Sequence, residues 1–191
     1  MERICVFAGS NDGARESYLI AARELGAEIA RRGHRLVYGG AACGLMGACA
    51  DAALAGGAEV VGVLPRALTT RELAHTGLTE MRIVGSLHER KAVMSALSDA
   101  VVALPGGCGT MDELFEAITW GQLGLHEKPI GLLDVDGYFA PLVTFIEHMN
   151  SEGFVRPPLR LLRARTPREL LDQLLAAPPA TVSPPGPHPR P

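Results

Sequence analysis

Short apolar runs alternate along the chain with longer segments in which apolar residues recur at helical spacing. Most of these runs contain no polar position, which is typical of strands buried on both faces of a parallel sheet. The runs predict strands at 4–8, 36–38, 60–64, 81–84, 100–104 and 130–133, with a weaker seventh at 159–164.

Helices are predicted between these strands. Tyr18, Ala22, Leu25 and Ile29 form one apolar stripe on a helix over 16–32, and Gly33 ends it. Further helices are predicted near 45–55, 87–97, 110–123, 138–151 and 167–176. The alternation predicts an α/β fold, a Rossmann-like doubly wound parallel sheet with helices on both faces. Ligands bind such sheets at the carboxyl ends of the strands, so the loops that leave the strands are where chemistry is expected.

Length and composition predict a single domain over residues 1–177 and a separate tail over 178–191. The tail holds seven of the 14 prolines and almost no apolar side chains, so we expect it to be disordered. No apolar run approaches the roughly 20 residues of a membrane helix. A net charge of −3 argues against nucleic acid as a partner. The chain starts without a signal-peptide pattern and its four cysteines lack disulfide-framework spacing, which predicts a cytoplasmic protein.

Two glycine-containing loops near the start of the chain fit either a ligand-binding role or a purely structural one. Residues 9–13 have only part of a dinucleotide-binding fingerprint and fit an ordinary strand-to-helix turn as well. Residues 39–47 lack the Lys-Ser/Thr pair of a Walker A loop, which excludes ATP hydrolysis by that route. Their glycines fit either a close approach to a ligand or tight packing of a helix on the sheet.

The strongest signal is the loop over residues 105–113, Pro-Gly-Gly-Cys-Gly-Thr-Met-Asp-Glu, directly after a predicted strand. Glycines and a threonine at the start of a helix offer free N–H groups and the positive end of the helix dipole, which suit a phosphate. The spacing of Thr110 and Glu113 is also that of a capping box, in which Thr110 caps the helix and Glu113 bonds back to it.

Two adjacent cations precede this loop. Only two of the 18 basic residues are lysines, Lys91 and Lys128, and Lys91 follows Arg90 directly. Such a pair is often a solvated surface patch. Near a phosphate, however, the carboxylate of Glu113 would need compensation, because two like charges about 4 Å apart repel by roughly 4 kcal/mol at an effective dielectric constant near 20. Arg90 can supply that compensation.

These segments together resemble the Lonely Guy family of cytokinin riboside 5′-monophosphate phosphoribohydrolases. The resemblance covers roughly residues 3–165 and is carried by residues 38–47, by His88-Glu89-Arg90-Lys91, by the loop over 105–113 and by residues 119–130. It implies hydrolysis of the N-glycosidic bond of an N6-substituted AMP. Neither a metal nor a cofactor is implied, and the histidines show no metal-ligand spacing. Family members are dimers, so a homodimer is expected through the apolar stretch Phe115, Ile118, Trp120, Leu123 and Leu125.

The resemblance also implies roles for single residues. Arg90 and Glu113 match the catalytic pair, and the remaining matches are substrate contacts: Glu72, Lys91, Gly106, Gly107, Gly109, Thr110 and Thr119. Two positions depart from the common pattern, Ala41 in place of a glycine and Cys108 in place of an aromatic residue. A cysteine at position 108 could alter the shape of the base pocket.

Other functions fit parts of the pattern. A lysine decarboxylase, the older label of this family, needs pyridoxal phosphate and a Schiff-base lysine, and neither Lys91 nor Lys128 is well placed for that role. A nucleotide or molybdenum-cofactor carrier of the same fold would keep the glycine loop without needing Arg90 and Glu113. A less selective nucleosidase acting on AMP itself would keep the glycine loop as well as Arg90 and Glu113.

Overall fold

The computed structural model describes residues 2–69, 74–155 and 161–177. The strands of this part are β1 (Arg3–Phe7), β2 (Arg35–Tyr38), β3 (Val60–Pro65), β4 (Glu80–Val84), β5 (Ala100–Ala103), β6 (Ile130–Leu133) and β7 (Leu162–Ala164). Its α-helices are α1 (Glu16–Arg31), α2 (Gly44–Ala55), α3 (Leu87–Ala96), α4 (Cys108–Gln122), α5 (Ala140–Ser151) and α6 (Pro167–Ala176). Two short 3-10 turns, η1 (Arg66–Leu68) and η2 (Val135–Gly137), follow β3 and β6.

All seven strands pair in parallel in one sheet, in the order β4-β3-β2-β1-β5-β6-β7. The predicted α/β fold is confirmed. Every residue of β5 and β6 is buried, as their unbroken apolar runs predict, whereas the edge strand β4 exposes Glu80, Arg82 and Ile83. The strand order reverses between β1 and β5, which opens a crevice at their carboxyl ends, where sheets of this type bind ligands.

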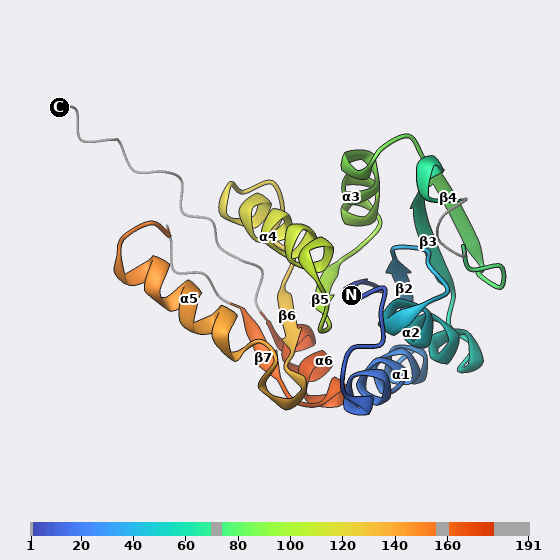
Figure 1. The fold of residues 1–191 in the computed structure, drawn as a ribbon, viewed down its shortest axis with the longest axis horizontal. Coiled ribbons are helices and arrows are strands. Elements are labelled where there is room, and N and C mark those ends of the chain that lie inside the picture. The colour runs from blue at the N-terminus through green and yellow to red at the C-terminus, as the bar shows by residue number, and fades with distance from the viewer. Residues whose placement is uncertain (1, 70–73, 156–160, 178–191) are drawn as a thin grey trace.

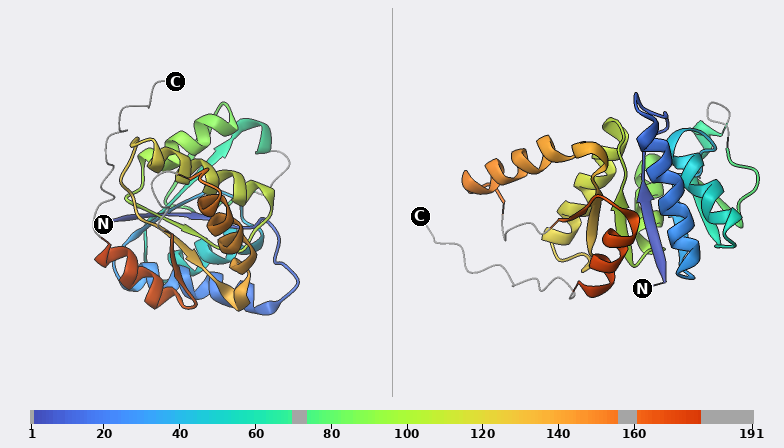
Figure 2. Two further views of the ribbon diagram at one scale, coloured as in Figure 1. Left: turned by 90° about the vertical axis from the view of Figure 1, so that its left-hand side faces the viewer. Right: turned by 90° about the horizontal axis from the view of Figure 1, so that it is seen from below.

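Helices cover both faces of the sheet (Figures 1 and 2). On one face, α1, α2 and α6 pack through side chains such as Leu25, Cys49 and Leu171. On the other face, α3, α4 and α5 pack through side chains such as Met94, Leu114 and Leu142. Both helical layers therefore bury apolar side chains against a sheet that is apolar on both sides.

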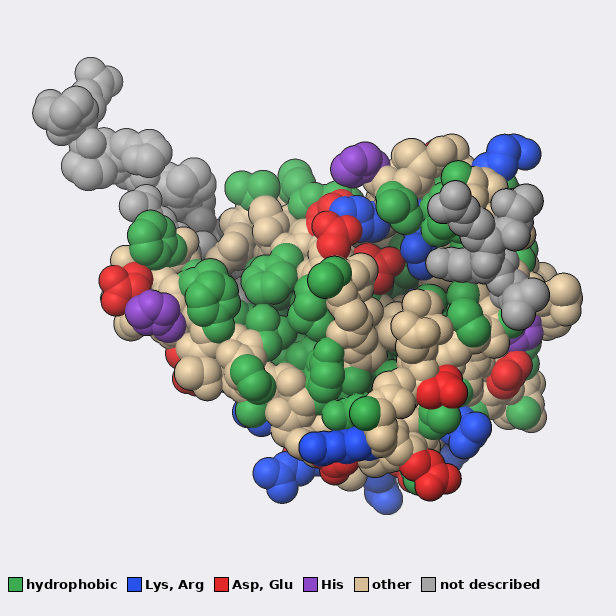
Figure 3. Space-filling view, in the orientation of Figure 1, with side chains coloured by type: hydrophobic (Ala, Val, Ile, Leu, Met, Phe, Trp, Pro, Cys, Tyr) green, Lys and Arg blue, Asp and Glu red, His purple; other side chains and the backbone are tan. Residues whose placement is uncertain are grey.

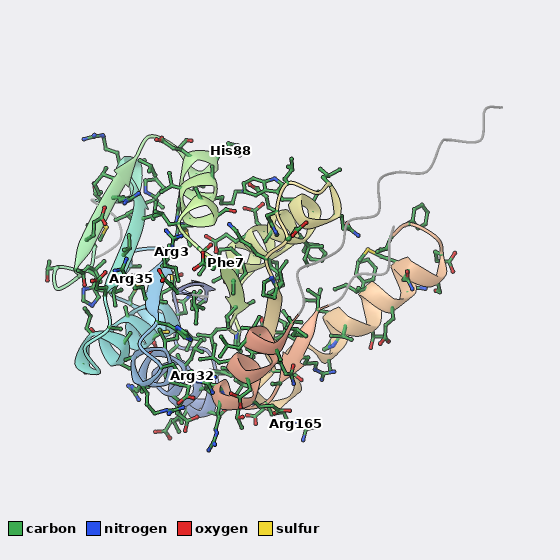
Figure 4. The ribbon with its side chains drawn as sticks, turned by 180° about the vertical axis from the view of Figure 1, so that it is seen from behind. Arg3, Phe7, Arg32, Arg35, His88 and Arg165 are labelled. Carbon is green, nitrogen blue, oxygen red and sulfur yellow. The ribbon has the colours of Figure 1, made fainter. Side chains whose placement is uncertain are left out.

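Charged contacts join the ends of these elements. Arg32, labelled in Figure 4, follows α1 and lies 2.8 Å from the Asp172 carboxylate of α6. Arg3 at the start of β1 lies 3.3 Å from Asp99, just before β5. The second contact joins the two strands that flank the crevice at their amino ends, away from the loops that line it.

The Pro-rich tail, predicted to be disordered, lies outside the described residues. Within the described ranges, no helix combines the length and apolar character that crossing a bilayer requires.

Candidate active site

A cavity of about 410 Å³ lies at the carboxyl ends of β1 and β5, in the crevice that the strand order predicts. Its size is within the range of small-molecule sites. Seven segments line it: the loop after β1, the starts of α1 and α2, helix α3, the loop after β5, the start of α4 and the turn after β6. The lining residues are Ala8, Gly9, Ser10, Asn11, Gly13, Tyr18, Leu45, Met46, Arg90, Pro105, Gly106, Gly107, Cys108, Gly109, Thr110, Glu113 and Tyr138.

Packing explains one glycine of the loop after β5 and leaves two unexplained. A Cβ on Gly106 would lie 2.1 Å from the Thr110 hydroxyl, so this position has no room for a side chain. Gly107 and Gly109 do not have positive φ, and a Cβ on either would meet no protein atom within 4 Å. Neither conformation nor packing requires glycine at these two positions, and both line the cavity. Bare backbone there leaves space for a ligand to approach closely.

The predicted capping box is not found. Helix α4 begins at Cys108, two residues before the predicted start, so its N-cap is Gly107 and no side chain caps it. Thr110 is buried in the first turn against Gly106. The first amides of the helix are thus left for a ligand at the positive end of the helix dipole.

Arg90 reaches the cavity from α3 and is almost completely buried. Its Nη2 atom donates to the Gly39 carbonyl at 3.2 Å and lies 3.8 Å from Oε1 of Glu113. A Cβ on Gly39 would lie 1.9 Å from the same nitrogen, so the glycine after β2 makes room for the guanidinium. The buried Nε atom has no hydrogen-bond partner among the described residues, which leaves a donor free at the site.

Glu113 lies one turn into α4 with its carboxylate mostly buried. Burial raises the pKa of this carboxyl from its ordinary value of 4.5 to about 7, against the opposing attraction of Arg90. Asp112 adds to the increase and Lys91 reduces it. A carboxyl that titrates near neutral pH can accept or donate a proton during a reaction. The structure therefore brings the predicted pair, Arg90 and Glu113, together at the cavity.

Lys91 has a different environment from its neighbour. Its ammonium lies 2.9 Å from Asp112 and also pairs with Glu116, both on α4. The side chain is buried and does not line the main cavity; it lies behind Glu113, beside a small void that Glu113 and Glu116 also border. This double ion pair ties α3 to α4 behind the carboxylate.

The other residues singled out in the sequence do not all lie at the cavity. Thr119 is exposed on α4, donates to the Phe115 carbonyl at 2.7 Å and does not line the cavity. Glu72 lies outside the described residues. His88 is exposed at the start of α3 (Figure 4). Cys108 lines the cavity, as the sequence comparison with the family pattern led us to expect.

Sequence reasoning missed two aromatic residues that line the cavity, Tyr18 and Tyr138. The sequence pattern places Tyr18 on the apolar stripe of the helix over 16–32 and Tyr138 in the first turn of the helix over 138–151. The Asp136-Gly137 pair, three residues after the predicted strand over 130–133, is a turn signal that points to Tyr138.

Comparison with known proteins shows the family of this chain. A family model described as "Possible lysine decarboxylase" matches residues 46–174. The cytokinin riboside 5′-monophosphate phosphoribohydrolase LOG3 of Arabidopsis thaliana is 49% identical over 174 residues, which cover 90% of this chain and 81% of the relative. The enzyme of the same name designated LOG in Oryza sativa subsp. japonica is also 49% identical, over 90% of this chain and 72% of the relative. The chain belongs to the Lonely Guy family.

A solved structure described as the molybdenum cofactor carrier protein of Chlamydomonas reinhardtii shares the fold of this Lonely Guy family member. Its TM-score is 0.71 at 25% identity, and the match covers 92% of this chain and 99% of the carrier. Neither lysine of the chain is placed to act as the Schiff-base lysine that the decarboxylase description of the family model would require. Lys91 pairs with two carboxylates, Lys128 donates to Ser95, and neither lysine lines the cavity.

Proposed function

We propose that this protein hydrolyses the N-glycosidic bond of a cytokinin riboside 5′-monophosphate, an N6-substituted AMP, and releases the free base and ribose 5-phosphate. The observation that carries the proposal is the buried Glu113 carboxyl beside Arg90, in the same cavity as an uncapped helix start. Relatives 49% identical to this chain are named for this reaction, which supports its assignment here.

The phosphate of the substrate would bind at the start of α4. The bare positions Gly107 and Gly109 leave space there, and the first-turn amides and helix dipole favour a dianion. Binding energy from the phosphate would then hold the ribose in place without acting on the reacting bond itself. Gly106 and Thr110 would support this loop by packing on each other, because the Thr110 side chain fills the space that a Cβ on Gly106 would need.

Glu113 and Arg90 would perform the chemistry. As the C1′–N9 bond breaks, its electron pair passes to the purine, which takes up a proton from solvent, and positive charge develops on the ribose. An ionised Glu113 stabilises that charge, accepts one proton of the water whose oxygen bonds to C1′, and then releases this proton to solvent. Arg90 balances the negative charges of Glu113 and the phosphate, which would otherwise repel each other.

Three further residues predicted to contact the substrate, Lys91, Thr119 and Glu72, differ in how well the structure supports that role. Lys91 is predicted to bind substrate, but its two ion pairs support a role in fixing α4 behind Glu113. Thr119 is exposed on a surface where a second copy of the chain could complete the site. Glu72 stays a prediction. We also infer a homodimer, supported by exposed apolar residues at the end of α4, and a cytoplasmic location, supported by free thiols at all four cysteines.

The test is release of free base from isopentenyladenosine 5′-monophosphate, AMP and the nucleoside isopentenyladenosine, measured side by side. We expect the nucleoside to be a very poor substrate, because the phosphate contacts are lost and the cationic pocket stays unpaired. Similar kcat/KM values for the nucleoside and its monophosphate would contradict the phosphate assignment. Equal values for AMP and the N6-substituted nucleotide would instead identify a less selective nucleosidase.

A carrier of molybdenum cofactor is the second candidate, favoured by the fold shared with the Chlamydomonas protein. A carrier needs an anion site but has no use for a buried carboxyl that titrates near neutral pH beside an arginine. Binding of the cofactor without any release of base from the nucleotides would favour the carrier.

A further inference from the structure

The turn after β6 is built to place one aromatic side chain over the glycine loop. Asp134 is buried at the end of β6, where its carboxylate accepts the Phe139 N–H at 2.7 Å and pairs with Arg163. Asp136 and Gly137 follow with φ of 52° and 76°. Positive φ is uncommon outside glycine, so Asp136 marks a turn whose shape is enforced by its surroundings.

This turn also bonds to α1 on the other side of the crevice. The Asp136 carboxylate accepts from the Ser17 hydroxyl at 2.7 Å and lies 3.6 Å from Arg15. The rings of Tyr138 and Tyr18 pack edge to face with centroids 5.8 Å apart, and Tyr138 packs in the same way on Phe139. Tyr138 is therefore held from both sides, although 38% of it remains exposed.

The hydroxyl of Tyr138 donates to the Gly106 carbonyl oxygen at 2.5 Å. That carbonyl belongs to the same planar trans peptide unit as the Gly107 N–H, and the two groups of such a unit point in opposite directions. A hydrogen bond that fixes the carbonyl thus fixes the direction of the N–H. The Gly107 N–H, at the N-cap of α4, donates to no acceptor among the described residues.

From this geometry we propose that Tyr138 is a positioning residue for the phosphate site: its hydroxyl orients the Gly106–Gly107 peptide so that the Gly107 N–H binds the phosphate of the substrate. The proposal rests on the proposed function, because it assumes a phosphate at the start of α4. The hydroxyl itself bonds to the loop, and the Tyr138 ring lines the cavity wall.

The experiment compares Tyr138→Phe with a matched control, Tyr38→Phe. Both variants remove one tyrosine hydroxyl and keep the ring, but Tyr38 is buried at the end of β2, does not line the cavity, and its hydroxyl has no hydrogen-bond partner among the described residues. Two products serve as probes, as competitive inhibitors or by calorimetry: ribose 5-phosphate, which carries the phosphate, and the free base, which does not.

Tyr138→Phe is expected to weaken ribose 5-phosphate binding about threefold to tenfold, the usual effect of one hydrogen bond. It should raise KM for the monophosphate by a similar factor and leave binding of the free base unchanged. Tyr38→Phe should leave ribose 5-phosphate binding and KM unchanged. A role in stability alone would lower the melting temperature and the fraction of active protein without separating the two probes.

The outcomes distinguish the two proposals. Equal ribose 5-phosphate binding by wild type, Tyr138→Phe and Tyr38→Phe overturns the positioning role, even where the wild type releases base from nucleotides. Absence of base release by the wild type refutes the hydrolase, while weakened ribose 5-phosphate binding in Tyr138→Phe alone would still support the positioning role. A wild type that binds no ribose 5-phosphate overturns both assignments of the loop.

Discussion

At the scale of single residues, the site depends on a charge held where water cannot solvate it. Glu113 is mostly buried, and Arg90, the one cation among the described residues that line the cavity, lies 3.8 Å away rather than in direct hydrogen-bond contact. Burial therefore outweighs the attraction of Arg90, and the pKa of Glu113 rises to about 7. The same imbalance affects both reactivity and stability.

Glu113→Gln is expected to lower kcat at least about a hundredfold while making the protein more stable at pH 8. The amide can neither accept a proton nor balance the developing charge. Because the folded pKa lies above the ordinary value of 4.5, stability falls as pH rises from about 4.5 to about 7. Glutamine does not ionise, so the variant keeps this stability. Its free energy of unfolding at pH 8 should exceed that of wild type by up to about 3 kcal/mol.

Urea unfolding of both proteins at pH 5 and pH 8 checks this expectation. The difference should be small at pH 5, where the wild-type carboxyl is mostly protonated in the folded protein. A variant that is less stable than wild type at pH 8 would mean that the ion pair with Arg90 outweighs burial. A variant with near-normal turnover would remove Glu113 from the mechanism.

The activity of wild type should rise with pH through about 7, because the ionised form of Glu113 is the reactive one. The measurement is kcat/KM for the monophosphate between pH 5 and pH 9, which reports groups of the free enzyme. Phosphate itself ionises near pH 6, so the inhibition constant of ribose 5-phosphate over the same range is the control. A profile that follows this constant throughout would assign the pH dependence to the phosphate.

At the scale of elements, the sequence pattern predicted the strands and helices, whose apolar positions recur along the chain. It did not predict features that depend on contacts between distant segments. Unbroken apolar runs located five of the seven strands, because a strand buried on both faces has no polar position to interrupt it. The runs of the two edge strands, β4 and β7, are interrupted by Arg82 and Arg163. The start of α4 was predicted two residues late, since a glycine N-cap leaves no side-chain signal. The ion pair of Lys91 with Asp112 and the bond from Tyr138 to Gly106 join residues 21 and 32 positions apart, beyond any local pattern.

Gly109→Ala tests the start of α4 as a phosphate site. Alanine favours a helix by up to about 1 kcal/mol over glycine, and its Cβ would meet no protein atom within 4 Å. The variant should therefore be at least as stable as wild type, while its methyl group, facing the cavity, weakens ribose 5-phosphate binding. Gly121→Ala, in the last turn of the same helix and outside the cavity, is the control and should leave binding unchanged. Weakened binding by the control alone would contradict the assignment.

At the scale of the whole molecule, the two helical layers differ in the apolar surface they leave exposed. Figure 3 shows apolar side chains gathered over α4 and α5. Leu123 and Leu125, just after α4, are each 68% exposed, and Phe145 on α5 is 54% exposed. Ile118, predicted to share this surface, is buried instead, and Phe115 and Trp120 are half-buried. Apolar side chains clustered in this way are typical of an interface rather than of a solvated face.

We expect a homodimer through this surface, and Leu125→Glu should dissociate it. A charge placed in an apolar interface loses its water without gaining a partner, so association is strongly weakened. Ile20→Glu is the matched control: Ile20 is 45% exposed, but it lies on α1, in the helical layer on the opposite face of the sheet. Light scattering of the wild type and both variants, with base release measured on the same samples, tests the expectation.

Dimers for wild type and Ile20→Glu with a monomer for Leu125→Glu would support the predicted interface, and loss of activity in that monomer would show that a second chain completes the site. A wild type that is monomeric and fully active in dilute solution would contradict the dimer, and the exposed Thr119 would then have no partner subunit through which to reach the substrate.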